Sequence, residues 1–222
     1  MADLKERIAK RCAKHFEDGD FINLGIGLPT MVADYLPEDV IITCHSENGF
    51  AGIDVLADAD TLDVNIINSG GQYVTALPRA KFFDTAESFG LVRGGHVKAT
   101  VLGAMEVAEN GDIANWIVPG KSVPGMGGAM DLVVGAKKVI VAMQHTQKGA
   151  PKLFEKISLP ATALKAVDMI VTEMGVIEIT DRGFELRELA PGVTVDDIKA
   201  ATAAPIIVEG EIKEMCMPES SR

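Results

Sequence analysis

The stretch SENGFAGID, residues 46–54, places a single carboxylate in a glycine-containing loop after the apolar run VIITCH. Glu47 is followed by Asn48, Gly49 and Gly52. A glutamate is ionised at neutral pH and can attack without a base, if the site excludes water and supplies donors for the developing oxyanion. Gly49 and Gly52 would let a substrate or another backbone approach closely. The stretch alone leaves two interpretations open: a covalent nucleophile, or a solvated acid in a turn.

A second glycine cluster, PGKSVPGMGGAMD, covers residues 119–131. Successive glycines can turn backbone N–H groups inward and bind an anion or an oxyanion. The alternative is a structural loop whose glycines only meet unusual dihedral angles. A second cluster of this kind favours the nucleophile interpretation of Glu47 over that of a solvated acid in a turn.

Other familiar sites are not indicated. NLGIGLPT, residues 23–30, lacks the third glycine of a dinucleotide fingerprint and the lysine of a P-loop. The four histidines show no metal-ligand spacing. Cys44 and His45 are neighbours on a predicted strand and would point to opposite faces, which predicts a core cysteine and a histidine at a surface edge.

Composition restricts the kinds of binding partner and the cellular compartment that we expect for this protein. The chain has 222 residues, 47% of them hydrophobic and 5% aromatic, and a formal charge of −11. We expect one domain over residues 1–222 with an aliphatic core. The acidic balance argues against nucleic acid and anionic membranes but does not exclude a small anion. Three unpatterned cysteines, no signal-like N-terminus and no apolar stretch of roughly 20 residues predict a soluble cytoplasmic protein.

Helical and strand periodicities alternate along the chain, which predicts an α/β fold with a mixed sheet. The expected helices cover residues 4–16, the stretch after Pro29, 85–93, 160–166 and 194–202. The expected strands cover 21–24, 40–44, 98–102, 138–143 and 206–208, with hairpins turning at Asn110-Gly111 and near Asp181-Arg182-Gly183. The tail after about residue 212 is expected to be flexible.

Six motifs in one order produce a family resemblance. They are NLGIGLPT, SENGFAG, NSGG, SFGLVRGGHV, GDIANWIVPGK and GMGGAMDLV, within residues 23–133. Together they resemble the β subunit of the class I 3-oxoacid CoA-transferases, and the similarity covers nearly the whole chain. The resemblance implies a layered α/β fold shared with sugar-phosphate isomerase relatives.

The resemblance also implies site residues. Glu47 matches the covalent nucleophile of the family. Gly127 and Gly128 match the loop that binds the reacting acyl oxygen, with Gly128 the preferred candidate. Asn23 matches an asparagine near the active site.

The implied reaction is a ping-pong transfer of CoA through a glutamyl-CoA thioester. Asn48, Gly49 and Gly52 would then form a loop with clearance for the pantetheine arm of CoA. Neither a metal nor a redox cofactor is implied, because the CoA thioesters are substrates. The acyl pair stays open: acetoacetate with acetate, butyrate or succinate would all suit the family.

The resemblance implies a separate α subunit as well, in an α2β2 assembly, because fused members carry a related N-terminal half. One position departs from the pattern: Gly71 stands where some members have a lysine. Two other functions remain alternatives, an acyl-CoA hydrolase and a non-catalytic ligand-sensing domain of the same fold.

Overall fold

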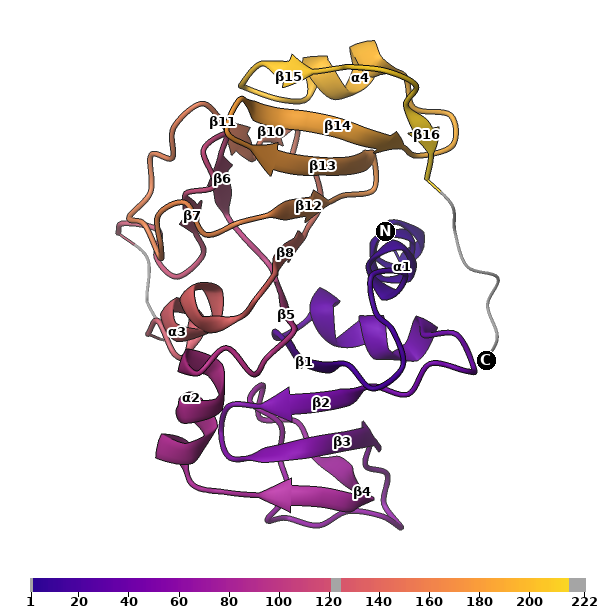
Figure 1. Ribbon diagram of the computed structural model, residues 1–222, viewed down its shortest axis with the longest axis vertical. Coiled ribbons are helices and arrows are strands. Elements are labelled where there is room, and N and C mark those ends of the chain that lie inside the picture. Colours follow the sequence, from indigo (N-terminus) through magenta and orange to yellow (C-terminus); the bar gives the residue numbers. More distant parts are fainter. Residues whose placement is uncertain (1, 121–124, 216–222) are drawn as a thin grey trace.

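The computed structural model describes residues 2–120 and 125–215, built around one large mixed sheet (Figure 1). The strand order is β15-β14-β13-β12-β8-β5-β1-β2-β3-β4, and β16 pairs with β14. The strands are β1 Phe21–Leu24, β2 Thr43–Ser46, β3 Phe50–Leu56, β4 Val74–Phe82, β5 Ala99–Leu102, β8 Val139–Ala142, β12 Met169–Val171, β13 Gly175–Thr180, β14 Gly183–Leu189, β15 Ile206–Ile207 and β16 Lys213–Glu214. The central strands are parallel, antiparallel pairs flank them on both sides, and β15 and β16 pair with β14 in parallel, so the α/β class with a mixed sheet is confirmed.

Helices cover both faces of the central strands. α1 Ala2–Ala13 and the 3₁₀ helix η1 Leu28–Tyr35 lie on one side, and α2 Thr85–Arg93 and α3 Ala129–Gly135 on the other, while α4 Val195–Ala200 packs near β14 (Figure 1). Two small sheets complete the fold, one of β6 Glu106–Ala108, β7 Ile113–Ala114 and β11 Leu153–Phe154, the other of β9 Thr146–Gln147 and β10 Ala150–Pro151.

Strand β8 shows why a continuous apolar run belongs in the centre. Ile140 and Ala142 pack into the core beside α1, whereas Val139 and Val141 pack into the core on the opposite face. Both faces of this central parallel strand are buried, so apolar side chains are favoured on both.

Local signals placed several elements correctly. α2 begins after Asp84, whose carboxylate accepts the N–H of Glu87 at 2.8 Å. α4 begins with a reciprocal capping box between Thr194 and Asp197. The turn between β6 and β7 places Gly111 at φ 87°, a conformation that glycine adopts without strain.

Four expectations differ from the structure. Residues 160–166 form no helix, because Thr162 and Ala163 bond instead to the backbone of Ile113 in β7. The stretch after Pro29 is a 3₁₀ helix rather than an α-helix. The strand expected at 40–44 begins at Thr43, because Val40 bonds back to Pro37 in a turn. The first residues of the expected flexible tail form β16, and the rest, 216–222, including Cys216, lie outside the described residues.

The first helix is joined to the last long strand by a buried ion pair. Arg11 on α1 donates two hydrogen bonds of 2.6 Å to the carboxylate of Glu188 on β14, and its third nitrogen lies 2.9 Å from His15 Nε2. The Arg11 side chain is 9% exposed and that of Glu188 18%. Burial and the positive charge of Arg11 lower the His15 pKa to about 4.

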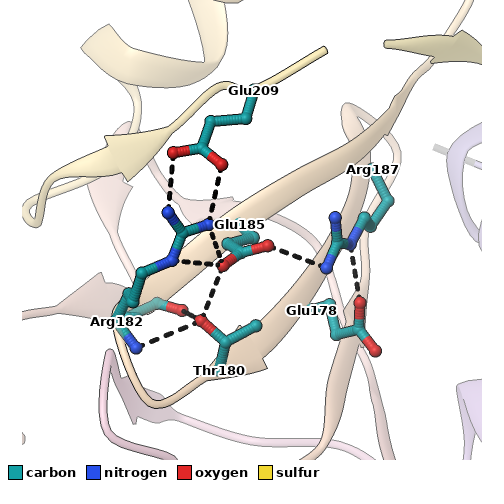
Figure 2. A network of polar contacts seen from close by, with 7 residues as sticks. Glu178, Thr180, Arg182, Glu185, Arg187 and Glu209 are labelled. Carbon is teal, nitrogen blue, oxygen red and sulfur yellow. Dashed lines mark hydrogen bonds and ion pairs between the residues drawn. The ribbon is translucent and has the colours of Figure 1, made fainter. Parts of the chain in front are cut away.

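A network of charges covers the outer hairpin, with exposed arginines around the buried Glu185 (Figure 2). Arg182 contacts Glu185 and Glu209, and Arg187 contacts Glu185 and Glu178, each at 2.6 or 2.7 Å. The hydrogen bond from Arg182 lowers the pKa of Glu185. The network holds β13, β14 and the segment after β15 together.

Candidate functional site

Three side chains meet where the central parallel strands end. β1 pairs with β2 and with β5, and the register places Asn23 beside both His45 and Thr100. All three side chains are buried. Glu47 follows β2 by one residue, at the carboxyl end of the parallel strands, which is where open α/β sheets usually bind their ligands.

The carboxylate of Glu47 accepts a hydrogen bond from the side chain of Asn23. Nδ2 of Asn23 lies 3.1 Å from Oε2 of Glu47 and 3.2 Å from the carbonyl oxygen of His45. On the other side of the amide, the Thr100 hydroxyl lies 3.3 Å from Oδ1 of Asn23. Asn23 has no exposed surface and Glu47 is half-buried, so the amide is a fixed donor beside a carboxylate that a substrate can reach.

His45 is a component of the site that the sequence did not indicate. Its ring is 1% exposed, so the expectation of a histidine at a surface edge is wrong. The rings of Phe21 and Phe83 pack against it, and its Nε2 lies 2.9 Å from the hydroxyl of Ser88 on α2. Burial lowers the pKa of His45, and the charge of Glu47 opposes that shift.

The spacing of His45 and Glu47 in the sequence was a signal that could have placed His45 at the site. His45 precedes Glu47 by two residues, and residues two apart on a strand share a face. Cys44 packs into the core on the side of α1, as expected, and burial raises the pKa of its thiol to about 12. A thiol protonated to that extent is not a nucleophile.

The structure brings the two glycine clusters together at Gly128. A Cβ atom on Gly128 would lie 3.3 Å from Cγ of Glu47 and 2.8 Å from the ring of Phe89. Gly127 is exposed, at φ 57°, and its Cβ would meet nothing within 4 Å. Gly128 is therefore the one of the two that lies against Glu47. Residues 121–124 of the same loop are outside the described ranges.

The two glycines after Glu47 lie against another backbone. A Cβ on Gly49, at φ 134°, would be 2.6 Å from the carbonyl oxygen of Phe83. A Cβ on Gly52, at φ 96°, would be 3.0 Å from Cα of Ala80 in β4. The sequence left open whether these glycines make room for a substrate or for another backbone. In the structure, both lie close against the backbone of residues 80–83.

The loop is also tied to residues 67–69. The Ser46 hydroxyl accepts the N–H of Ser69 at 2.9 Å and donates to Oδ1 of Asn48 at 2.6 Å. The amide of Asn48 in turn donates to the carbonyl oxygen of Ile67 at 2.8 Å. These bonds hold the Glu47 turn in one conformation.

A cavity of about 320 Å³ lies beside this loop. No Lys or Arg is among the described residues that line it, and its charged groups are the carboxylates of Asp34 and Asp54. Its lining is Leu24, Ile26, Thr30, Ala33, Asp34, Cys44, His45, Ile53, Asp54, Val55, Leu56, Asn68, Ser69, Gly70, Gln72 and Val74. The apolar walls suit an uncharged part of a ligand and offer no counter-charge to an anion.

The described ranges, 2–120 and 125–215, contain no group of three or more His, Cys, Asp or Glu residues arranged to hold a metal ion. None of their helices is both long and apolar enough to cross a bilayer.

The known proteins that this chain is similar to are coenzyme A transferases in each of the following comparisons. The coenzyme A transferase family model matches residues 5–201. The β subunit of acetate CoA-transferase from Haemophilus influenzae is 51% identical over 212 residues, which are 95% of each chain. The human mitochondrial succinyl-CoA:3-ketoacid coenzyme A transferase 2 is 44% identical over 96% of this chain, which matches 42% of that longer protein. The crystal structure of an acyl-CoA transferase from Escherichia coli O157:H7 has the same fold, with a TM-score of 0.74 and 22% identity over 96% of this chain and 43% of its own.

Proposed function

Because this chain belongs to the coenzyme A transferase family, we propose that it is the subunit carrying the nucleophile, and that Glu47 is that nucleophile. The reaction moves CoA from an acyl-CoA to a free carboxylate through a thioester on Glu47. The observation that carries the proposal is the half-buried Glu47 carboxylate held by the Asn23 amide and lying against Gly128.

The first half-reaction loads CoA onto the protein. An oxygen of Glu47 attacks the carbonyl carbon of the donor thioester, the carbon–sulfur bond breaks, and CoA leaves as a thiolate. The product is a mixed anhydride between the acyl group and Glu47. The thiolate then attacks the glutamyl carbon, the anhydride carbon–oxygen bond breaks, and the donor acid leaves as its carboxylate. The half-reaction consumes the negative charge of the Glu47 carboxylate and releases one on the donor carboxylate, so no proton is transferred.

The second half-reaction is the reverse with a different acid. The acceptor carboxylate attacks the glutamyl-CoA thioester and releases the CoA thiolate, which then attacks the acceptor's carbonyl carbon. The acceptor leaves as its CoA ester and Glu47 returns to a carboxylate. Interactions with the remote parts of CoA can contribute to desolvation and orientation at Glu47.

Asn23 and Gly128 have separate roles in this scheme. The Asn23 N–H group donates to the carboxylate before attack and remains beside the oxygen on which charge develops when the thiolate attacks the glutamyl carbon. Gly128 has no side chain beside Cγ of Glu47, so it leaves room for the neighbouring carboxyl carbon, Cδ, to become tetrahedral. We assign no separate chemical step to Gly127.

We further propose an α subunit as the partner. The Haemophilus influenzae relative is named a β subunit, and this chain corresponds to less than half of the human relative. CoA carries phosphate groups, whereas the described residues that line the cavity next to His45 include two aspartates and no Lys or Arg. The cations that bind these phosphates would therefore come from outside this cavity, and the α subunit is the source we propose. Native mass spectrometry of the co-expressed subunits tests the expected α2β2 assembly.

For the acids, we propose acetoacetate as the 3-oxoacid and a short carboxylate as its counterpart. Acetate is the substrate in the name of the Haemophilus influenzae relative, and succinate derives from the name of the human one. The described part of this chain places no Lys or Arg in the cavity lining, so a cation for the second carboxylate of succinate would, like those for CoA, come from the α subunit. Comparing kcat/KM for acetate, butyrate and succinate identifies the counterpart.

The deciding experiment traps the covalent intermediate. The co-expressed complex is incubated with acetoacetyl-CoA and no acceptor, reduced with borohydride, digested and mapped by mass spectrometry. We expect a CoA adduct on the intact chain before reduction and a reduced side chain at Glu47 afterwards. The same protocol with Glu38→Ala, an exposed acid elsewhere, should give the same adduct.

Two results would contradict the proposal. Steady release of free CoA at the rate of acyl-CoA consumption, without an acceptor, would indicate a hydrolase. Binding of acyl-CoA with Glu47 unmodified and no CoA released would indicate a ligand-sensing domain.

A further inference from the structure

We infer that His45 is a positioning residue: it holds the amide of Asn23 in the orientation that directs an N–H group at Glu47. The inference rests on the proposed function, because a donor at Glu47 matters only if Glu47 reacts. It concerns a residue that acts on Glu47 through the side chain of Asn23.

The orientation of the amide follows from its two neighbours. A carboxylate oxygen only accepts, so the amide group that faces Glu47 at 3.1 Å is Nδ2. Oδ1 then faces the hydroxyl of Thr100, which donates to it at 3.3 Å. A flipped amide would direct its oxygen at the carboxylate.

The same reasoning fixes the histidine. Nδ2 of Asn23 lies 3.4 Å from Nδ1 of His45, and Nδ2 can only donate. Nδ1 must therefore be unprotonated, and the ring proton lies on Nε2, which is 2.9 Å from the Ser88 hydroxyl. His45 is thus neutral with an Nε2–H group that donates to Ser88.

The result is an ordered row of groups that crosses three elements. It runs from Ser88 on α2 through His45 on β2 to Asn23 on β1, and ends at Glu47. The two hydrogens of Nδ2 face Glu47 on one side and the carbonyl oxygen and ring of His45 on the other. Removing the ring nitrogens leaves the amide less constrained, and a loosely held donor contributes less to a transition state than a fixed one.

A double-mutant cycle in the co-expressed complex tests this. His45→Phe keeps a ring between Phe21 and Phe83 and removes both nitrogens. We expect kcat to fall on the order of 10-fold to 100-fold, with the KM for acyl-CoA within about 2-fold of wild type. In an Asn23→Ala background, His45→Phe should add less than about 2-fold, because the amide through which it acts is absent.

His45→Asn is the conservative comparison, since its carbonyl oxygen can replace Nδ1 as an acceptor, and it should retain more kcat than His45→Phe. His96→Asn, at an exposed histidine, should leave both constants unchanged. Equal losses from His45→Phe in the wild-type and Asn23→Ala backgrounds would overturn the inference, because they would indicate general damage. So would a lower kcat for His45→Asn than for His45→Phe.

One measurement needs neither a variant that folds well nor turnover. In the wild-type complex with 15N-labelled histidine in this chain, the nitrogen shifts of His45 should show Nδ1 unprotonated and Nε2 protonated. A proton on Nδ1 would overturn the inference. A wild-type complex that forms no glutamyl-CoA adduct would instead contradict the proposed function, whatever the state of His45.

Discussion

The side-chain amide of Asn23 lies 3.1 Å from the carboxylate of Glu47, although the two residues are 24 positions apart. The contact exists because β1 and β2 are parallel neighbours that place Asn23 beside His45, and Glu47 follows His45 on the same face of the chain. The donor and the nucleophile are therefore carried by different strands with a fixed relative position.

Replacing Asn23 should slow the chemical steps more than it weakens binding. Asn23→Ala removes the donor, and we expect kcat to fall by about 100-fold to 1,000-fold, as for other lost oxyanion donors. Asn23→Asp keeps the shape but places a second carboxylate beside Glu47, and it should be no more active than Asn23→Ala. Steady-state kinetics of the complex measure both, and an Asn23→Asp variant with near-normal kcat would contradict the donor role.

Replacing Glu47 should abolish transfer and leave the fold intact. Glu47→Ala has no nucleophile, and Glu47→Asp withdraws the carboxylate by one methylene, which moves it out of attack geometry. A half-buried loop acid contributes little stability, so the melting temperature should stay close to wild type. Turnover above about one per cent of wild type in Glu47→Ala would exclude Glu47 as the nucleophile.

The two glycines of the 119–131 loop should respond differently to alanine. The Cβ of Gly128→Ala would meet the Phe89 ring and Cγ of Glu47, so we expect a kcat loss of at least about 10-fold. Gly127→Ala meets no neighbour, and its φ of 57° costs only about 1 to 2 kcal/mol of stability. Kinetics and thermal unfolding of both variants separate the two effects, and equal kcat values would contradict the role of Gly128.

The buried ion pair between Arg11 and Glu188 should be costly to break. Glu188→Gln leaves a buried guanidinium without its counter-charge, and we expect a loss of about 3 to 5 kcal/mol in the free energy of unfolding. Arg93→Met breaks the exposed pair with Asp131, where the arginine is 68% exposed, and should leave the free energy of unfolding much closer to that of wild type, because water screens this pair. Urea unfolding of the two variants tests the difference.

Stability should fall as the pH is lowered from 7 to 5. Burial lowers the pKa of His145 to about 4, well below the 6.5 of an exposed histidine. The unfolded state therefore binds a proton that the folded state does not, and stability decreases with pH below about 6.5. At pH 5 this histidine alone should remove about 1 to 2 kcal/mol. His145→Gln should flatten the pH dependence of urea unfolding, whereas His96→Gln, at an exposed site, should not.

Local chemistry explains which elements the sequence could predict. Asp84 and Thr194 mark helix starts by bonding to N–H groups three residues away, and β8 is apolar on both faces, so each signal lies within one short segment. β3 and β4 gave no such signal, because they form an exposed edge of the sheet and much of their surface faces solvent. Their place depends on Gly49 and Gly52 packing against residues 80–83, which is a long-range contact.

The contrast between signals within one segment and contacts between distant segments also applies to the site. The sequence indicated Glu47 and the glycine loop because each lies in a compact motif. His45 was misplaced because its burial depends on Ser88 and two phenylalanines from other segments. A strand's own residues show which face a side chain occupies, but not what will cover it.

The pairing of Arg11 with Glu188 also has a consequence for the order in which the chain folds during synthesis. α1 is synthesised before β14, and its arginine cannot pair with Glu188 until residue 188 has left the exit tunnel. The β1–β2 region, which holds Asn23 and Glu47, packs in the same core as α1. The reactive end of the sheet is thus completed only after β14 has been translated, so a nascent chain that stops before β14 cannot assemble this site in its final form.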